Sequence, residues 1–261
     1  MSRLNNPVTI IIPARYHSTR FPGKPLALLA GKPLIQHVYE RALQAPGVRA
    51  VYVATDHPAI ATTVQTFGGQ VRLIDTPCRT GTDRVAAAAR SLSGEIFVNL
   101  QADEIPLHPA WFHDLIQPFL ASTTPIGTLK RPIMDPEEIA KPSVVKVVTD
   151  RTGKALYFSR ASIPYLRDGT RSSASPLFSV HLGVYIFRRA ALFAFADLPS
   201  GILEESEQLE QLRALEYGLP IQVWDTAYPS LRIDTREELE AANQQWTYLQ
   251  EQVPVTKEHH P

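Results

Sequence analysis

Residues 8–26 read VTIIIPARYHSTRFPGKPL, a run of β-branched residues that leads directly into a loop of prolines, cations and a glycine. The continuous apolar run at 8–12 is typical of a strand buried on both faces of a parallel sheet. In open α/β sheets, ligands bind outside the carboxyl ends of such strands. The stretch therefore predicts a parallel α/β sheet, and it places Arg15, Arg20 and Lys24 where a ligand would bind.

Short apolar runs and amphipathic segments continue to alternate up to about residue 120. The sequence predicts further strands at 50–54, 71–74 and 96–100, and helices at 33–43, 58–67 and 82–91. No internal period indicates a repeat array. Because this alternation is typical of βαβ units, we expect the four strands to share one sheet.

After about residue 120 the composition changes, since proline, serine and threonine become frequent. The sequence predicts strands at 143–150, 181–187 and 221–225, and helices at 203–217 and from Thr235 onward. The polar, Gly/Ser-rich residues 167–176 predict a mobile loop. We interpret residues 120–195 as an extension of the sheet with a projecting segment, within a single domain that covers 1–261.

The composition argues against several classes of protein. The 261 residues include 26 Lys and Arg and 26 Asp and Glu, so the formal net charge is zero. Nucleic-acid binding needs a surplus of cations on one face, and this balance argues against it. The single cysteine, Cys78, excludes an internal disulfide and a Cys-based zinc site, which fits a reducing compartment.

The sequence also predicts neither a membrane span nor an export signal. Its apolar stretches are far shorter than the roughly 20 residues that span a bilayer. Residues 1–7, MSRLNNP, lack the apolar centre of a secretion signal. We therefore expect a cytoplasmic protein without a membrane partner.

The loop after the first strand is the most informative segment. Arg15, Arg20 and Lys24 stand five and four residues apart, among prolines and Gly23. Such a cluster suits a polyanion such as a triphosphate, to which the backbone amides of a turn and a helix N-terminus would add neutral donors. The alternative is an ordinary solvated basic loop.

Two well-known phosphate motifs do not fit this loop. No G-x-G-x-x-G follows the first strand, which leaves a dinucleotide-binding site without support. Gly23 and Lys24 are followed by Pro25, so a P-loop would lack its Ser or Thr hydroxyl, and Ser18 replaces the upstream glycine. We therefore do not expect a P-loop kinase.

Acidic residues follow two of the expected strands. Asp103 and Glu104 come after the strand at 96–100, and Asp234 ends a late RID segment. Carboxylates at two strand ends can converge on one Mg²⁺, which prefers oxygen ligands and completes its shell with water and substrate phosphates. An aspartate there can equally form a turn or cap a helix. The cationic loop favours the metal, because acidic and basic groups would then address one triphosphate.

Motifs along nearly the whole chain resemble one enzyme family. In chain order they are IIPARYHSTRFPGKPL (11–26), ATDH (54–57), TGTDR (80–84), NLQADE (99–104), VVKVV (144–148), ALYFSRASIPY (155–165), HLGVY (181–185), LEQLRALEYG (209–218) and IDTREELE (233–240). Together they resemble the 3-deoxy-manno-octulosonate cytidylyltransferases, the CMP-Kdo synthetases of lipopolysaccharide synthesis. CMP-sialate synthetases share the N-terminal loop, whereas YFSRA-x-IP and HLG-x-Y distinguish the family.

The resemblance implies a fold and a reaction. The fold would be α/β, a Rossmann-like nucleotide-diphospho-sugar transferase with a mixed, mostly parallel sheet. The protein would be a homodimer, with residues 120–195 containing a projecting segment for sugar binding and dimerisation. The reaction would be the Mg²⁺-dependent conversion of CTP and a 3-deoxy-2-ulosonic acid into a CMP-sugar and pyrophosphate.

The resemblance also implies a role for each matching residue. The expected catalytic residues are Lys24, Arg15 and Asp103. Magnesium would be ligated by Asp103 and Asp234. The nucleotide would be bound by Arg15, Arg20, Lys24, Thr82, Arg84 and Gln101. The sugar pocket would be lined by Arg160, His181, Tyr185, Glu210 and Gln211. Apart from the resemblance, these last residues would be interpreted as surface charges, sheet packing and a hydrogen-bonded core histidine.

The chain departs from the family pattern at two places. Ala102 and Ile105 replace the Gly and Pro of the usual Q-G-D-E-P, and alanine is costly if residue 102 needs a positive φ. Glu205 and Ser206 replace a His and an Ile of the usual LEHIEMLEQLR. An added carboxylate would suit a sugar acid with an amine in place of a hydroxyl, such as 8-amino-Kdo.

Two other functions fit parts of the pattern. One is a nucleotide-binding sensor or partner subunit without turnover, which the presence of both Asp103 and Asp234 disfavours. The other is a nucleotidyltransferase acting on a sugar phosphate, which would not need the YFSRA and HLG-x-Y segments.

Overall fold

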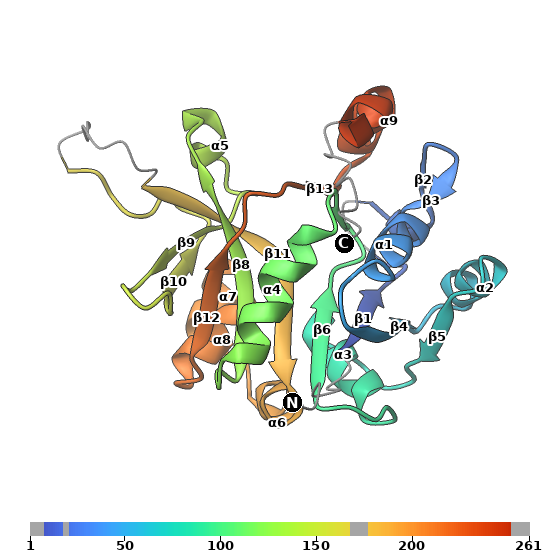
Figure 1. The fold of residues 1–261 in the computed structure, drawn as a ribbon, viewed down its shortest axis with the longest axis horizontal. Coiled ribbons are helices and arrows are strands. Elements are labelled where there is room, and N and C mark those ends of the chain that lie inside the picture. The colour runs from blue at the N-terminus through green and yellow to red at the C-terminus, as the bar shows by residue number, and fades with distance from the viewer. Residues whose placement is uncertain (1–7, 18–20, 168–176, 252–261) are drawn as a thin grey trace, which may run out of the picture.

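A mixed sheet of nine strands organises the part of the chain that the structure describes, residues 8–17, 21–167 and 177–251 of the computed structural model. Seven strands follow one another in the order β10-β9-β11-β6-β1-β4-β5; β8 also pairs with β11, and β12 pairs in parallel with β8. They are β1 (Val8–Ala14), β4 (Val48–Thr55), β5 (Gln70–Leu73), β6 (Ile96–Leu100), β8 (Ile126–Ile133), β9 (Lys146–Thr149), β10 (Ala155–Ser159), β11 (Phe178–Arg188) and β12 (Ile221–Asp225). Figure 1 shows β9 and β10 at one end of the molecule and β4 and β5 at the other.

The half of the sheet that contains the predicted βαβ units is parallel. β1 pairs in parallel with both β4 and β6, and β4 pairs in parallel with β5. The helices of the described chain are α1 (Leu34–Ala42), α2 (Pro58–Thr66), α3 (Gly81–Ala89), α4 (Ala110–Ala121), α5 (Pro136–Ala140), α6 (Arg189–Asp197), α7 (Ile202–Glu207), α8 (Gln211–Glu216) and α9 (Arg236–Glu251). The four strands and three helices predicted in the first half are confirmed, as is the α/β class with its mixed sheet.

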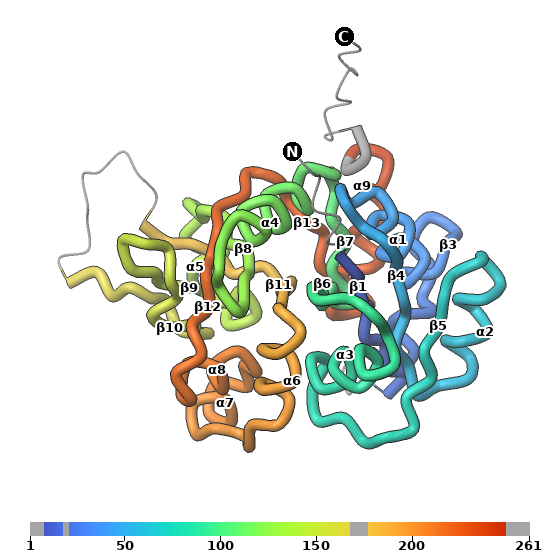
Figure 2. Tube along the Cα trace, turned by 60° about the horizontal axis from the view of Figure 1, so that its bottom comes forward, coloured from blue at the N-terminus to red at the C-terminus, as the bar shows by residue number. Residues whose placement is uncertain are grey.

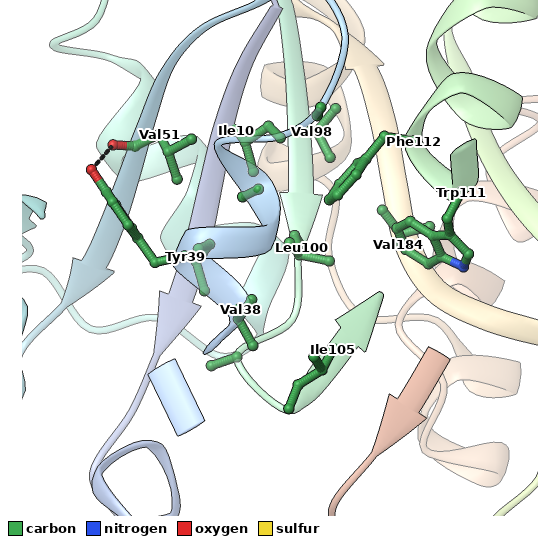
Figure 3. Packing of buried hydrophobic residues seen from close by; sticks show 14 of the residues in the cluster. Ile10, Val38, Tyr39, Val51, Val98, Leu100, Ile105, Trp111, Phe112 and Val184 are labelled. Atoms are coloured by element: carbon green, nitrogen blue, oxygen red, sulfur yellow. Dashed lines mark hydrogen bonds between the residues drawn. The ribbon is translucent and has the colours of Figure 1, made fainter. Parts of the chain in front are cut away.

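Alternate residues of the central strands pack into two separate hydrophobic cores, because neighbouring residues of a strand point to opposite faces of the sheet. Ile10 and Ile12 of β1 join α1, α2, α4 and α9 on one face of the sheet. Ile11 joins α3, α6 and α8 on the other face. Figure 3 shows part of the first core, where the Tyr39 hydroxyl donates to the Val51 carbonyl at 3.2 Å. Burial on both faces explains why the β1 sequence is apolar without alternation.

The other half of the sheet is antiparallel around the long strand β11. This strand pairs antiparallel with β6, β8 and β9, and β10 pairs antiparallel with β9. The predicted strands at 143–150, 181–187 and 221–225 correspond to β9, β11 and β12, but the sequence pattern predicts neither β8 nor α4. Pro118 lies inside α4 and Pro132 lies inside β8, and a proline in either element obscures its periodic pattern.

The single helix predicted at 203–217 is wrong, because the structure contains two helices there. α7 ends at Glu207, the next residue Gln208 is left-handed with φ 53° and ψ 47°, and α8 begins at Gln211. An L-residue in this conformation cannot continue a right-handed helix. The break turns Glu210 toward α3, where the Thr82 hydroxyl donates to Glu210 Oε1 at 2.6 Å.

A small two-stranded sheet brings two distant segments of the chain together. β7 (Glu104–Pro106) pairs antiparallel with β13 (Ser230–Arg232). The backbone N–H of Ile233 then donates to the Asp103 carbonyl at 3.1 Å. Because Asp103 directly precedes β7 and Asp234 closely follows β13, this pairing sets the two aspartates at the same place.

The segment 120–195 contributes α5, β9 and β10, which lie far from α2 and β5 in both views of the chain (Figure 1 and Figure 2). The predicted mobile loop at 167–176 falls, apart from Arg167, outside the described residues. In the described ranges, no helix is both long and apolar enough to cross a membrane.

Candidate active site

A cavity of about 570 Å³ lies where the chain leaves β1 and β6, and it extends along β11 to α7 and α8. It is lined by Pro13, Arg15, Lys24, Pro25, Arg79, Thr80, Gln101, Ala102, Asp103, Glu104, Val145, Arg160, His181, Gly183, Tyr185, Ser200, Glu204, Glu205, Gln208, Leu209, Glu210, Gln211, Arg232 and Asp234. The cavity therefore joins the carboxyl ends of the parallel strands to the antiparallel half of the sheet.

Lys24 connects the two predicted metal ligands. Its Nζ donates to Asp103 Oδ2 and, at 3.1 Å, to Asp234 Oδ1. The side chains of Lys24, Asp103 and Asp234 are 13%, 20% and 10% exposed. Gly23, at φ 73°, provides the left-handed residue that turns the loop before Lys24. We refer to this cluster of two carboxylates, Asp103 and Asp234, and two cations, Lys24 and Arg232, as the acidic end of the cavity.

The two aspartates fit a hard divalent cation. They already hold one cationic group between them, the ammonium of Lys24. Across the described ranges, no three His, Cys, Asp or Glu side chains gather as a metal site. Mg²⁺ commonly uses one or two carboxylates and takes its other ligands from water and substrate phosphates. Asp103 and Asp234 therefore suit a cation that binds together with an anionic substrate.

Sequence reasoning missed Arg232, the second cation at the acidic end. Its Nε donates to Asp234 Oδ2 at 3.0 Å. The Arg232 side chain is 45% exposed. Partial desolvation opposes its charge, but Asp103, Asp234 and Glu104 outweigh this effect and raise the pKa of the guanidinium. Burial raises the pKa of Glu104, against the effects of Arg232 and of the hydroxyl of Ser230 that donates to it. Only the pairing of β7 with β13 reveals these contacts, and the sequence does not predict this pairing.

His181 and Tyr185 form one wall of the cavity on β11, which we call the β11 wall. The Thr128 hydroxyl donates to the Val184 carbonyl at 2.6 Å, so its oxygen accepts from His181 Nε2 at 3.0 Å. This arrangement assigns the proton to Nε2 and leaves Nδ1 as an acceptor. Burial, helped by Arg232, lowers the pKa of His181 to about 3, so the imidazole is neutral at pH 7.

Tyr185 lies beside His181, with ring centroids 5.3 Å apart. Burial raises the pKa of Tyr185 well above its usual value, and the charge of Glu210 acts in the same direction. The phenol therefore keeps its proton and can donate a hydrogen bond. Together the wall presents a neutral acceptor and a neutral donor.

Arg160 is attached to two backbone segments beside the cavity. Its Nε donates to the Glu207 carbonyl at 2.8 Å, and its Nη1 donates to the Pro142 carbonyl at 3.0 Å. The backbone of Arg160 is fixed as well, since its N–H donates to Glu207 Oε2 at 2.9 Å and its carbonyl accepts from Lys146 Nζ at 2.7 Å. The guanidinium is thus held on the cavity wall where β10 meets α7.

Glu210 and Gln211 enter the cavity at the start of α8. The Thr82 hydroxyl and backbone N–H donate to Glu210 Oε1 and Oε2 at 2.6 and 3.4 Å. Burial raises the pKa of Glu210, and these hydrogen bonds oppose the rise. All five residues expected at the sugar pocket, Arg160, His181, Tyr185, Glu210 and Gln211, therefore line the same cavity.

The residues expected at the nucleotide are less uniformly placed. Arg15, Lys24 and Gln101 line the cavity, whereas Thr82 and Arg84 are buried and are not among its lining residues. Arg84 Nη2 donates to Asp56 Oδ2 at 2.8 Å. Arg20 lies outside the described residues.

Two further features of the cavity concern the departures noted in the sequence. Glu205 lines the cavity and is exposed there, which places a carboxylate at the α7 side. In the described chain the non-glycine residues with positive φ are Ala30 and Gln208, so Ala102 adopts an ordinary φ and fits without the expected strain. Arg79, which precedes the TGTDR motif, also lines the cavity and was not predicted.

The fold and this cavity, with a cationic loop and two convergent carboxylates at the strand ends, define a nucleotidyltransferase. A model of the cytidylyltransferases matches residues 9–223. The chain belongs to the 3-deoxy-manno-octulosonate cytidylyltransferase family, as its motifs predicted.

Three similar proteins support this family membership. The 3-deoxy-manno-octulosonate cytidylyltransferase of Anaeromyxobacter sp. is 51% identical over 237 residues, 90% of this chain and 95% of the relative. The protein of the same name from Solibacter usitatus is 48% identical over 231 residues, 88% of this chain and 90% of the relative. The structure of a CMP:2-keto-3-deoxy-manno-octonic acid synthetase in complex with CTP has a TM-score of 0.84 at 40% identity, covering 93% of this chain and 99% of that chain.

Proposed function

We propose that this protein transfers the cytidylyl group of CTP to a 3-deoxy-2-ulosonic acid, Kdo or a close analogue such as 8-amino-Kdo, for lipopolysaccharide biosynthesis. The observation that supports this most is a single cavity that joins the acidic end to the β11 wall. At the acidic end, the cations suit a triphosphate and the two carboxylates suit a divalent cation. The β11 wall suits a polyhydroxylated acid. The names of the relatives, which specify this sugar acid and cytidylyl transfer, support the same proposal.

In the proposed reaction the anomeric 2-hydroxyl of the sugar acid attacks the α-phosphorus of CTP. A new O–P bond forms, and the bond from the α-phosphorus to the oxygen it shares with the β-phosphate breaks. The hydroxyl proton passes to solvent water, and pyrophosphate leaves. Transfer of this kind depends mostly on positioning and charge neutralisation. No nucleophile from the protein is required.

Lys24 and Arg15 would neutralise the triphosphate. Lys24 now pairs with Asp103 and Asp234, and phosphate oxygens of CTP can replace those carboxylates as its partners. The two aspartates would then hold Mg²⁺, whose charge helps to neutralise the phosphates and the leaving pyrophosphate. Thr82, Arg84, Gln101 and Arg20 would support the nucleotide.

At the other end, Nδ1 of neutral His181 would accept from a sugar hydroxyl, and the phenol of Tyr185 would donate to one. Arg160 would attract the carboxylate of the sugar acid. Glu210 and Gln211 would hydrogen-bond further hydroxyls. Such groups orient the sugar because their own protons are already assigned by the surrounding fold.

The test is pyrophosphate release with CTP or UTP, Mg²⁺, and either Kdo or a sugar phosphate. We expect turnover with CTP and the 2-ulosonic acid, and loss of turnover when the divalent cation is chelated. Protection against thermal unfolding by CTP without turnover would indicate a sensor. Turnover with the sugar phosphate instead would indicate the other nucleotidyltransferase, and either result would overturn the proposal.

We also propose that residues 1–261 form one domain that dimerises through the segment 120–195. Met134, Leu156 and Tyr165 expose 73%, 61% and 86% of their surface on this segment, and a dimer formed there would cover these apolar side chains. Sedimentation should give a dimer that Leu156→Glu weakens, and a monomeric wild-type protein would contradict this. A cytoplasmic location stays a prediction.

A further inference from the structure

Four polar side chains form a continuous hydrogen-bonded relay whose two ends, Gln101 and Glu210, line the cavity. Gln101 Nε2 donates to Asn99 Oδ1 at 2.9 Å, and Asn99 Nδ2 donates to Thr82 Oγ1 at 2.9 Å. The Thr82 hydroxyl donates to Glu210 Oε1 at 2.6 Å. The relay therefore runs from Gln101, at the end of β6, across α3 to Glu210, at the start of α8.

The carboxylate at one end of the relay fixes the direction of every hydrogen bond in it. Both carboxylate oxygens of Glu210 accept from Thr82, Oε1 from the hydroxyl and Oε2 from the backbone N–H, so the single hydroxyl proton of Thr82 points to Glu210. The Thr82 oxygen must then accept, which turns the amide nitrogen of Asn99 toward it. Asn99 consequently presents its oxygen to Gln101, and Gln101 must donate with Nε2. The outward atom of Gln101 is then its oxygen.

The relay has little room to rearrange. Asn99 is fully buried, and Thr82 is 1% exposed. The amide of Gln101 packs on Gly81, since a Cβ at that glycine would lie 3.1 Å from both Nε2 and Oε1 of Gln101. Buried networks that are satisfied at each member hold one arrangement rigidly.

We propose that Asn99 and Thr82 are positioning residues that present Gln101 Oε1 to the cavity as an acceptor for the amino or hydroxyl groups of the bound nucleotide. This proposal rests on the proposed function, because it assigns Gln101 a CTP-facing atom. Asn99 itself lies behind the cavity lining and acts through Gln101. Glu210 lies on the sugar side of the cavity, and through the relay it would also fix the orientation of Gln101 on the nucleotide side.

Two substitutions of Thr82 separate the relay from simple packing. Thr82→Val keeps the shape and removes the hydroxyl, whereas Thr82→Ser keeps the hydroxyl and removes a methyl group. The relay predicts that kcat/KM for CTP falls about tenfold in Thr82→Val and stays within about twofold of wild type in Thr82→Ser. A packing role predicts the reverse order, and that result would overturn the proposal.

A double-mutant cycle tests whether the relay acts through Gln101. In wild type, Asn99→Leu and Thr82→Val should each lower kcat/KM for CTP about tenfold. In the Gln101→Ala background, each should have less than about a twofold further effect, because the group they position is gone. Additive losses would show that these residues act elsewhere, which would contradict the proposal.

A readout independent of turnover distinguishes failure of the relay from failure of the proposed function. The side-chain ¹⁵N amide signal of Gln101, assigned by its loss in Gln101→Ala, should exchange slowly with water in wild type. It should exchange at least about tenfold faster in Thr82→Val and remain slow in Thr82→Ser. Equal exchange in all three proteins would overturn the relay even if CTP is turned over, and slow exchange without turnover would overturn only the proposed function.

Discussion

The two ends of the cavity satisfy their polar groups in different ways. At the acidic end, Lys24, Asp103 and Asp234 come from three segments and pair with one another. At the β11 wall, His181 bonds to the hydroxyl of Thr128, which belongs to the neighbouring strand β8. The acidic end would therefore exchange partners if the proposed triphosphate and cation bind there, whereas the groups of the wall are already held by the fold.

This difference separates two tasks of one site. When a charged ligand binds, a side chain that is already ion-paired can exchange its protein partner for the ligand. Each charge then still has a partner of opposite sign, so little free energy is lost. Neutral groups held by the fold would select the positions of the sugar hydroxyls in the proposed reaction, because their donors and acceptors are already oriented. Changes at the acidic end should therefore alter turnover more than stability, and changes that reach the supports of the β11 wall should alter stability.

The largest effect is expected for Asp103→Asn. The amide keeps the shape but removes the charge that would hold the cation, so kcat should fall about 10³-fold with little change in the unfolding midpoint. Pyrophosphate release and thermal unfolding measure the two quantities. Asp225→Asn is the matched control, since Asp225 is 76% exposed and pairs only loosely with Lys130 at 3.8 Å. Near-normal turnover in Asp103→Asn would contradict the comparison.

The next effect concerns the support of α7 and α8. Arg213 is fully buried and donates to Glu204 at 2.8 and 2.6 Å and to Asp83 at 3.3 Å. Arg213→Met leaves a buried carboxylate without its partner, which should cost about 3–5 kcal/mol in the free energy of unfolding.

Urea unfolding measures the loss in Arg213→Met. The control is Arg90→Met, because Arg90 is 62% exposed and its surface pair with Asp197 should contribute less than about 1 kcal/mol. Adding Glu204→Gln to Arg213→Met should recover part of the loss. Equal stability of the two arginine variants would show that the buried pair does not support these helices.

The sequence predicted the elements that local pattern decides, and it missed those that depend on tertiary contacts. The parallel half of the sheet was predictable because β1, β4 and β6 are short apolar runs, and local pattern decides such strands. Those residues of the cavity that the sequence predicted, such as Arg15, Asp103 and His181, were predicted from motifs rather than from periodicity. Arg232 and the pairing of β7 with β13 were missed, since three-residue strands carry almost no pattern. The break at Gln208 was missed because a non-glycine left-handed residue is set by tertiary contacts, and no helix-ending signal marks it.

A smaller effect is the acid dependence of stability at the β11 wall. Burial lowers the pKa of His181 to about 3, while the unfolded value is 6.5. The unfolded state therefore binds the proton first, and stability is fully present above pH 6.5 and is lost progressively as the pH falls toward 3. The contribution of this group should be on the order of a few kcal/mol.

Unfolding free energies of wild type and His181→Gln between pH 4 and 8 test this dependence. The slope below pH 6.5 should be shallower in the variant, because glutamine does not titrate. His113→Gln is the matched control for replacing a histidine, since His113 is 62% exposed. An unchanged slope in His181→Gln would mean that the histidine is protonated in the folded protein, which would also remove its role as an acceptor.

The smallest effect is expected where the wall meets α7, at Glu205. Glu205 lines the cavity but is exposed, so an ion pair between it and a substrate amine should contribute less than about 1 kcal/mol. Glu205→Gln should therefore lower the kcat/KM ratio of 8-amino-Kdo to Kdo by about twofold to fivefold, with most of the change in KM for the amino sugar. Glu240→Gln, which removes an exposed carboxylate outside the cavity, should leave the ratio unchanged. Since the neutral sugar cannot form the ion pair, an equal loss for both sugars would show that Glu205 does not discriminate between them, and discrimination would then rest on the fixed groups of the β11 wall.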